Sequence, residues 1–167
     1  NPSTSVNLAE VLLRRGEARS VLLVCPKPLV TNWQREFSVW APEVPVLVIE
    51  GDQTKRRWLW SLADAPLRMA NYELLLRDRE MLEYQRFDLV VLDESQRIKN
   101  RSSNTSRVVR GITRNRGWAL TGTPVENSSE DLVGIFEFLM PGFLAPDMKP
   151  RKMGHTVRDY VLRRTKD

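Results

Sequence analysis

The chain has 167 residues, 41% of them hydrophobic and 28% charged, which is the composition of one ordinary globular domain. Its single cysteine, Cys25, excludes a disulfide within the chain and favours an intracellular setting, either cytoplasmic (a bacterial nucleoid) or, in a eukaryote, nuclear. No apolar run approaches the roughly 20 residues of a membrane span, so we expect no membrane partner. The formal net charge of +5 favours anionic partners, of which nucleic acid is the commonest.

Short apolar runs alternate with amphipathic stretches along the chain. The runs that we expect to form strands are residues 21–25, 46–49, 67–70, 88–92 and 117–121. The stretches that we expect to form helices are residues 5–15, 29–40, 54–63, 102–112 and 128–140. In the third of these helices, Trp58 and Leu62 are expected to lie on one face. Strands alternating with helices predict an α/β fold with a mostly parallel sheet covered on both faces.

The segment after the fourth strand carries the sharpest chemical signal. An apolar run, residues 88–92, delivers Asp93 and Glu94 into a polar turn. An aspartate at a strand tip can hold Mg²⁺, and the next glutamate can polarise an attacking water, which phosphoryl transfer to water requires. A turn with incidental acids is the structural alternative.

Three other predicted strands also end in polar residues, at the sheet edge where parallel α/β folds bind ligands. Residues 120–124 place Thr121, Gly122 and Thr123 at the end of the fifth strand. The two hydroxyls can hydrogen-bond to the acidic residues and respond to a change at a phosphate, or the segment is a tight turn that needs glycine. Lys27 follows the first strand and suits a phosphate, whereas Trp33 in the next helix is expected to be core. Asn71 and Tyr72 follow the third strand and either contact a nucleic-acid backbone or cap the next helix.

Basic residues are concentrated in two stretches. Residues 97–116 hold seven basic and no acidic side chains, and residues 149–166 hold seven more against one acidic side chain, Asp159. Arg97, Lys99 and Arg101 directly follow the acidic motif and are the preferred nucleic-acid contacts, with surface solubility as the alternative role. If they bind nucleic acid, affinity should fall as salt rises.

Taken together, these segments resemble the Swi/Snf-type, chromatin-remodelling-like branch of superfamily two helicases. The similar segments are residues 21–26 and 32–37 (motif Ia), 69–74 (motif Ib), 93–100 (motif II), 120–127 (motif III) and 160–166 (the connection between two motor lobes). The family's usual motif II is Asp-Glu-Ala-His, whereas this chain has Gln96 in the position of the histidine. A glutamine can still donate and accept hydrogen bonds.

The resemblance implies a RecA-like three-layer sandwich, ATP and Mg²⁺ as cofactors, and translocation along duplex DNA. It implies that Asp93 serves Mg²⁺, that Glu94 orients water, and that Gln96 couples hydrolysis to Thr121 and Thr123. It implies residues 1–144 as the first motor lobe, truncated at its start, and residues 145–167 as an extension toward a second lobe. The sequence pattern of residues 145–167 predicts no clear strand and places Val157, Tyr160 and Val161 on one helical face.

A phosphate-cradling Gly-x-x-x-x-Gly-Lys-Ser/Thr loop is absent from the sequence. The resemblance places this loop just before residues 5–15, so we expect the chain to begin at or just past it, and the second lobe to follow Asp167. We therefore expect these 167 residues alone to hydrolyse ATP negligibly. The segment from residue 142 to 160 is also shorter than the family usually has.

Two other functions remain open from the sequence. The chain is either a degenerate lobe that holds DNA or a protein partner without turnover, or another α/β domain of the phosphate-binding or receiver type that uses Asp93. Residues 120–124 and the Arg163-Arg164 pair count against the last of these.

Overall fold

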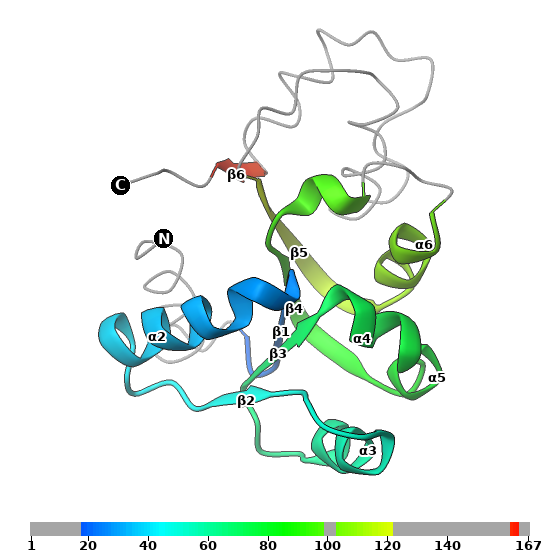
Figure 1. Cartoon of the computed structure of the whole chain (residues 1–167), viewed down its shortest axis with the longest axis horizontal. Coiled ribbons are helices and arrows are strands. Elements are labelled where there is room, and N and C mark those ends of the chain that lie inside the picture. Colours follow the sequence, from blue (N-terminus) through cyan, green and yellow to red (C-terminus); the bar gives the residue numbers. More distant parts are fainter. Residues whose placement is uncertain (1–17, 99–102, 122–160, 164–167) are drawn as a thin grey trace, which may run out of the picture.

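The fold is an α/β sandwich around one parallel sheet (Figure 1). The computed structural model describes residues 18–98, 103–121 and 161–163. Within these residues, six strands are hydrogen-bonded in the order β2-β3-β1-β4-β5-β6, and every pair is parallel. None of the helices described is both long and apolar enough to cross a membrane.

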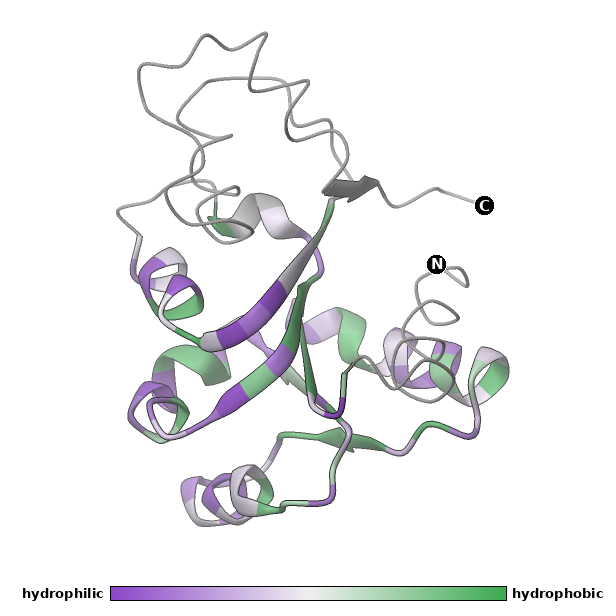
Figure 2. Cartoon of the chain, turned by 180° about the vertical axis from the view of Figure 1, so that it is seen from behind, coloured by the Kyte–Doolittle hydropathy of each residue, from purple (hydrophilic) through white to green (hydrophobic). Residues whose placement is uncertain are grey.

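The strands follow the apolar runs of the sequence. Their bounds are β1 Val21–Cys25, β2 Val46–Val48, β3 Leu67–Asn71, β4 Arg86–Leu92, β5 Thr113–Thr121 and β6 Val161–Arg163. β1 is buried at every position, as expected for a central strand covered on both faces. β5 begins earlier than expected, in a hydrophilic stretch that Figure 2 shows in purple.

Helices cover both faces of the sheet. Their bounds are η2 Lys27–Leu29, α2 Val30–Trp40, α3 Gln53–Ser61, α4 Tyr72–Arg77, α5 Arg79–Leu82, η3 Ser95–Ile98 and α6 Asn104–Arg110. α2 packs on one face, where its Trp33 and Phe37 meet Leu23 and Leu89 of the sheet. α3 to α6 contribute to the core on the other face, which Figure 1 shows on the side away from α2. The helices expected over residues 5–15 and 128–140 lie outside the described residues.

Trp58 and Leu62, which we expected on one face of α3, do not form its buried face. Trp58 is 58% exposed, whereas Leu59 and Trp60 are buried against the sheet. Leu62 ends the helix as its C-cap and packs only partly against the core. Residues 58 to 62 carry large apolar side chains on both sides of the helix, so the periodicity of the sequence alone does not show which side is buried.

The C-terminal segment also differs from expectation. Val161–Arg163 forms β6, which pairs with the end of β5 through Ala119↔Val161 and Thr121↔Arg163. Val161 therefore belongs to a strand rather than to a helical face, and part of the segment expected to be a linker extends the sheet.

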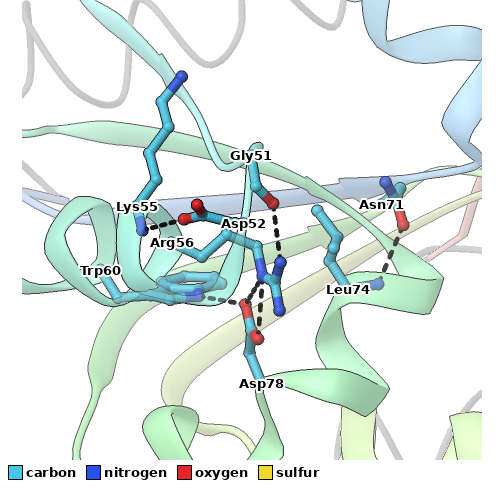
Figure 3. A network of polar contacts seen from close by, with 8 residues as sticks. All are labelled: Gly51, Asp52, Lys55, Arg56, Trp60, Asn71, Leu74 and Asp78. Carbon is cyan, nitrogen blue, oxygen red and sulfur yellow. Dashed lines mark hydrogen bonds and ion pairs between the residues drawn. The ribbon is translucent and has the colours of Figure 1, made fainter.

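A buried ion pair joins α3 to the junction between α4 and α5 (Figure 3). Arg56 Nε donates to both carboxylate oxygens of Asp78, at 3.1 and 2.9 Å, and its Nη1 donates to the carbonyl of Gly51 at 2.8 Å. Trp60 Nε1 donates to Asp78 Oδ2 at 2.9 Å. Gly51 adopts a positive φ of 95° at this turn, a conformation that glycine adopts without strain.

Candidate functional site

Four strand ends bring the polar segments together at one edge of the sheet. Val24 of β1 is level with Ala70 of β3 and Leu92 of β4, and Leu92 is level with Ala119 of β5. The residues that follow in each strand, Cys25, Asn71, Asp93 and Leu120, therefore lie in one row. This confirms that the ends of β1, β3, β4 and β5 meet at the carboxyl edge of the sheet.

Asp93 is fully buried at this edge. Its exposed fraction is 0%, and its backbone N–H donates to the carbonyl of Val24 at 2.8 Å. Trp33 Nε1, from α2, donates to Asp93 Oδ2 at 2.8 Å. Trp33 is itself 1% exposed and belongs to the core, as expected, but its contact with Asp93 is one that the sequence analysis missed.

Glu94 has the backbone conformation that stands out among the described residues. Its φ is +54°, the left-handed region that side chains other than glycine rarely adopt, at a cost of roughly 1–3 kcal/mol. Its N–H donates back to Asp93 Oδ1 at 3.0 Å. Strained residues of this kind cluster at active sites, so the geometry marks the turn after β4 as a candidate functional site.

Tyr72 and Asn71 have mainly structural contacts. The Tyr72 hydroxyl donates to the carbonyl of Asp93 at 2.6 Å, and the residue is 2% exposed. Because a side chain so buried does not reach a surface ligand, the expected nucleic-acid contact of Tyr72 is not supported. Asn71 Oδ1 accepts from the N–H of Leu74 at 3.0 Å and caps α4 (Figure 3), which confirms the capping alternative. A nucleic-acid contact through the amide nitrogen of Asn71 stays a prediction.

The other expected site residues are placed in part or not at all. Lys27 is exposed at the start of η2, directly after the end of β1. Gln96 and Arg97 lie in η3 and Thr121 ends β5, but their side chains are outside the described part of the structure. Gly122, Thr123, Lys99 and Arg101 lie wholly outside it. Their roles stay predictions.

Ser95 was not identified by the sequence analysis. It is 0% exposed, and its hydroxyl has no hydrogen-bond partner among the residues that the structure describes. A buried hydroxyl without a partner costs roughly 1–3 kcal/mol. Nothing in the sequence marks it, because a serine in a polar turn is ordinarily solvated.

The donor chemistry of the turn fits Mg²⁺. This ion prefers carboxylate oxygens and retains several of its waters, so it needs few protein ligands. Each oxygen of an ionised carboxylate has two acceptor positions, so the bond from Trp33 does not by itself exclude a second partner on Asp93 Oδ2. Within the described ranges there is no group of three or more His, Cys, Asp or Glu side chains that could hold a metal by themselves.

Comparison with known proteins gives consistent matches. The family model described as SNF2-related domain matches residues 4–149. The TATA-binding protein-associated factor MOT1 of Saccharomyces cerevisiae is 37% identical over 137 residues, which are 80% of this chain and 7% of that protein. The DNA repair and recombination protein RAD54B of Gallus gallus is 31% identical over 157 residues, which are 89% of this chain and 17% of that protein.

A solved structure gives the same result. The SWI2/SNF2 ATPase core of Sulfolobus solfataricus in complex with dsDNA is 28% identical and superposes with a TM-score of 0.84. The match covers 99% of this chain and 38% of that one. This likeness confirms the expected RecA-like α/β fold.

Proposed function

The chain belongs to the family of the SNF2-related domain, and we propose that it is the first motor lobe of an ATP-dependent duplex-DNA translocase. The chain spans less than a fifth of the length of the curated relatives described above, so the proposal concerns a lobe that works within a longer protein. The observation that carries it is the turn after β4, where a buried Asp93 is followed by a strained Glu94.

In this proposal, Asp93 holds Mg²⁺, which would neutralise the charge of the ATP phosphates. Glu94 would accept a hydrogen bond from the attacking water and align it with the terminal phosphorus. As the water oxygen bonds to that phosphorus, the bond from the phosphorus to ADP breaks and Glu94 takes up a proton of the water, which leaves ADP and phosphate. Gln96 relays the state of the nucleotide to Thr121 and Thr123 at the end of the neighbouring strand.

Duplex DNA is the proposed track. The solved structure with a TM-score of 0.84 is described as a complex with dsDNA, which supports duplex DNA as the ligand of this lobe. Lys27 and Asn71 are the described residues that we propose to face it. Arg97, Lys99 and Arg101 are proposed to add phosphate contacts, because they continue the chain directly from the catalytic turn. The second lobe of the same protein is the other proposed partner.

The test uses the full-length protein that carries this segment, with ATP hydrolysis measured with and without duplex DNA. Wild-type protein should show DNA-stimulated hydrolysis, and Glu94→Gln should lower kcat by at least about 100-fold with nucleotide binding retained. Glu43→Gln is the matched control, because Glu43 is exposed in the loop between α2 and β2, at the opposite edge of the sheet. It should leave kcat unchanged.

Movement on DNA requires its own assay. Wild-type protein should displace the third strand of a DNA triplex when ATP is present, and the Glu94→Gln variant should not. Nucleotide and DNA binding with no hydrolysis in the wild type would instead identify a degenerate binding lobe and refute the motor.

A further inference from the structure

We propose that Trp33 is a positioning residue for this site, whose indole N–H fixes the orientation of the Asp93 carboxylate. The inference rests on the proposed function, since it assigns Asp93 to Mg²⁺. The contact joins residues 60 positions apart, from α2 to the end of β4, and measures 2.8 Å between Nε1 and Oδ2. An indole N–H donates and never accepts, so it selects one carboxylate oxygen and holds it.

The carboxylate is held on both of its oxygens. Trp33 Nε1 donates to Oδ2, and the N–H of Glu94 donates to Oδ1 at 3.0 Å. Two donors on different oxygens fix the rotation of the carboxylate about its terminal bond. The backbone of the same residue is held by the Tyr72 hydroxyl, which donates to its carbonyl at 2.6 Å. Trp33 supplies a side-chain donor to this arrangement, and its loss leaves Oδ2 less restrained.

The donor is itself fixed in place. Trp33 is 1% exposed and packs beside Phe37, with ring centroids 6.1 Å apart. Because the indole is already held in place, little conformational entropy is lost when its N–H binds the Asp93 carboxylate in the orientation proposed to face Mg²⁺. Groups that orient a metal-bound side chain in this way typically change metal affinity or activity by about 10- to 100-fold when removed.

Core packing alone is the competing explanation, and the chain offers a matched control for it. Trp60 is also buried, at 2% exposure, and its Nε1 also donates to a buried aspartate, Asp78, at 2.9 Å. Trp60 lies on the other face of the sheet, in the core cluster of α3 and α4, and it has no part in the proposed mechanism. Trp33→Phe and Trp60→Phe therefore remove the same group and a similar volume.

The experiment compares the two variants in the full-length protein by kcat, KM for ATP and melting temperature. It also measures affinity for a fluorescent ATP analogue in Mg²⁺ and in EDTA. Trp33→Phe should lower kcat about 10- to 100-fold, change KM by less than about two-fold, and reduce the difference in affinity between Mg²⁺ and EDTA. Trp60→Phe should lower the melting temperature at least as much, with kcat and the Mg²⁺-dependent difference unchanged.

If Trp33→Phe does not fold, position 33 can carry 3-benzothienylalanine, which keeps the shape of indole and has sulfur in place of the N–H. Retained kcat and retained Mg²⁺ dependence in that protein would overturn the positioning role, as would equal effects of the two phenylalanine variants. Absence of hydrolysis in the wild type would refute the proposed function, and the Mg²⁺-dependent binding would then decide the role of Trp33. Wild-type nucleotide binding that does not depend on Mg²⁺ would overturn the positioning role of Trp33.

Discussion

Replacing Asp78 with asparagine should destabilise the domain strongly although it changes little in shape. The Asp78 carboxylate accepts two hydrogen bonds from Arg56 Nε, at 3.1 and 2.9 Å, and one from Trp60 at 2.9 Å (Figure 3). Arg56 is 7% exposed and Asp78 is 1% exposed, so little water is available to replace a lost partner. Asparagine removes the negative charge and turns one acceptor into a donor that faces other donors.

We expect Asp78→Asn to lower the free energy of unfolding by about 3 kcal/mol. Removing one partner of a buried ion pair costs roughly 3–5 kcal/mol, because the other charge remains desolvated. The lower end of this range applies here, since asparagine keeps one acceptor and Arg56 still donates to the carbonyl of Gly51. For a domain of this size, such a loss lowers the melting temperature by roughly 6–12 °C.

Urea denaturation of the chain, followed by tryptophan fluorescence, measures this loss. Arg68→Met is the matched control, because Arg68 is also buried, at 6% exposure, but has no carboxylate partner among the described residues. Its Nη2 donates to the carbonyl of Leu62, and its Nε has no partner among those residues. Burial lowers the pKa of the Arg68 guanidinium, which means that desolvation disfavours its charged form. This control should therefore be neutral or stabilising.

A cost below about 1 kcal/mol for Asp78→Asn would refute the reasoning, because a loss that small is typical of exposed ion pairs. The double variant Arg56→Met with Asp78→Leu gives a second check. It should be less destabilising than the sum of the two single variants, since it leaves neither charge without its partner.

Two smaller changes probe the candidate site and its surroundings. Ser95→Ala should stabilise the chain by about 1 kcal/mol in urea denaturation, because it removes a buried hydroxyl without a partner, and a loss of stability would mean that the hydroxyl is satisfied. Lys27→Gln should weaken duplex-DNA binding by the full-length protein. The slope of log affinity against log salt concentration should become shallower by about 1, and an unchanged slope would exclude a phosphate contact of Lys27.

The sheet was largely predictable because its strands are buried on both faces. β1 is a continuous apolar run, and so are residues 89–92 of β4, and such runs need no partner information to be recognised. β6 was missed because Val161–Arg163 has only three residues, and only its pairing with β5 makes it a strand. The burial of Arg56 in α3 was not predictable, because its partner Asp78 lies 22 residues away in the chain.

The candidate site was predictable in its composition but not in its contacts. Asp93 and Glu94 are adjacent in the chain, so a strand followed by two acids identifies them. Trp33 and Tyr72, which hold Asp93, come from helices that follow two other strands. Their roles depend on the strand register, which places the ends of β1, β3 and β4 in one row, and no local pattern encodes that register.

The two buried polar clusters differ in how their costs are offset. In the cluster of Asp78, the charge is paired with Arg56 and the carboxylate accepts three hydrogen bonds, which is what a structural role requires. At the end of β4, two consecutive residues each carry a local cost: Glu94 is left-handed, and the Ser95 hydroxyl has no hydrogen-bond partner among the residues that the structure describes. Sequences retain locally unfavourable choices of this kind mainly where function requires them. The distribution of these costs therefore favours the turn after β4 as the site of chemistry and the Asp78 cluster as part of the scaffold.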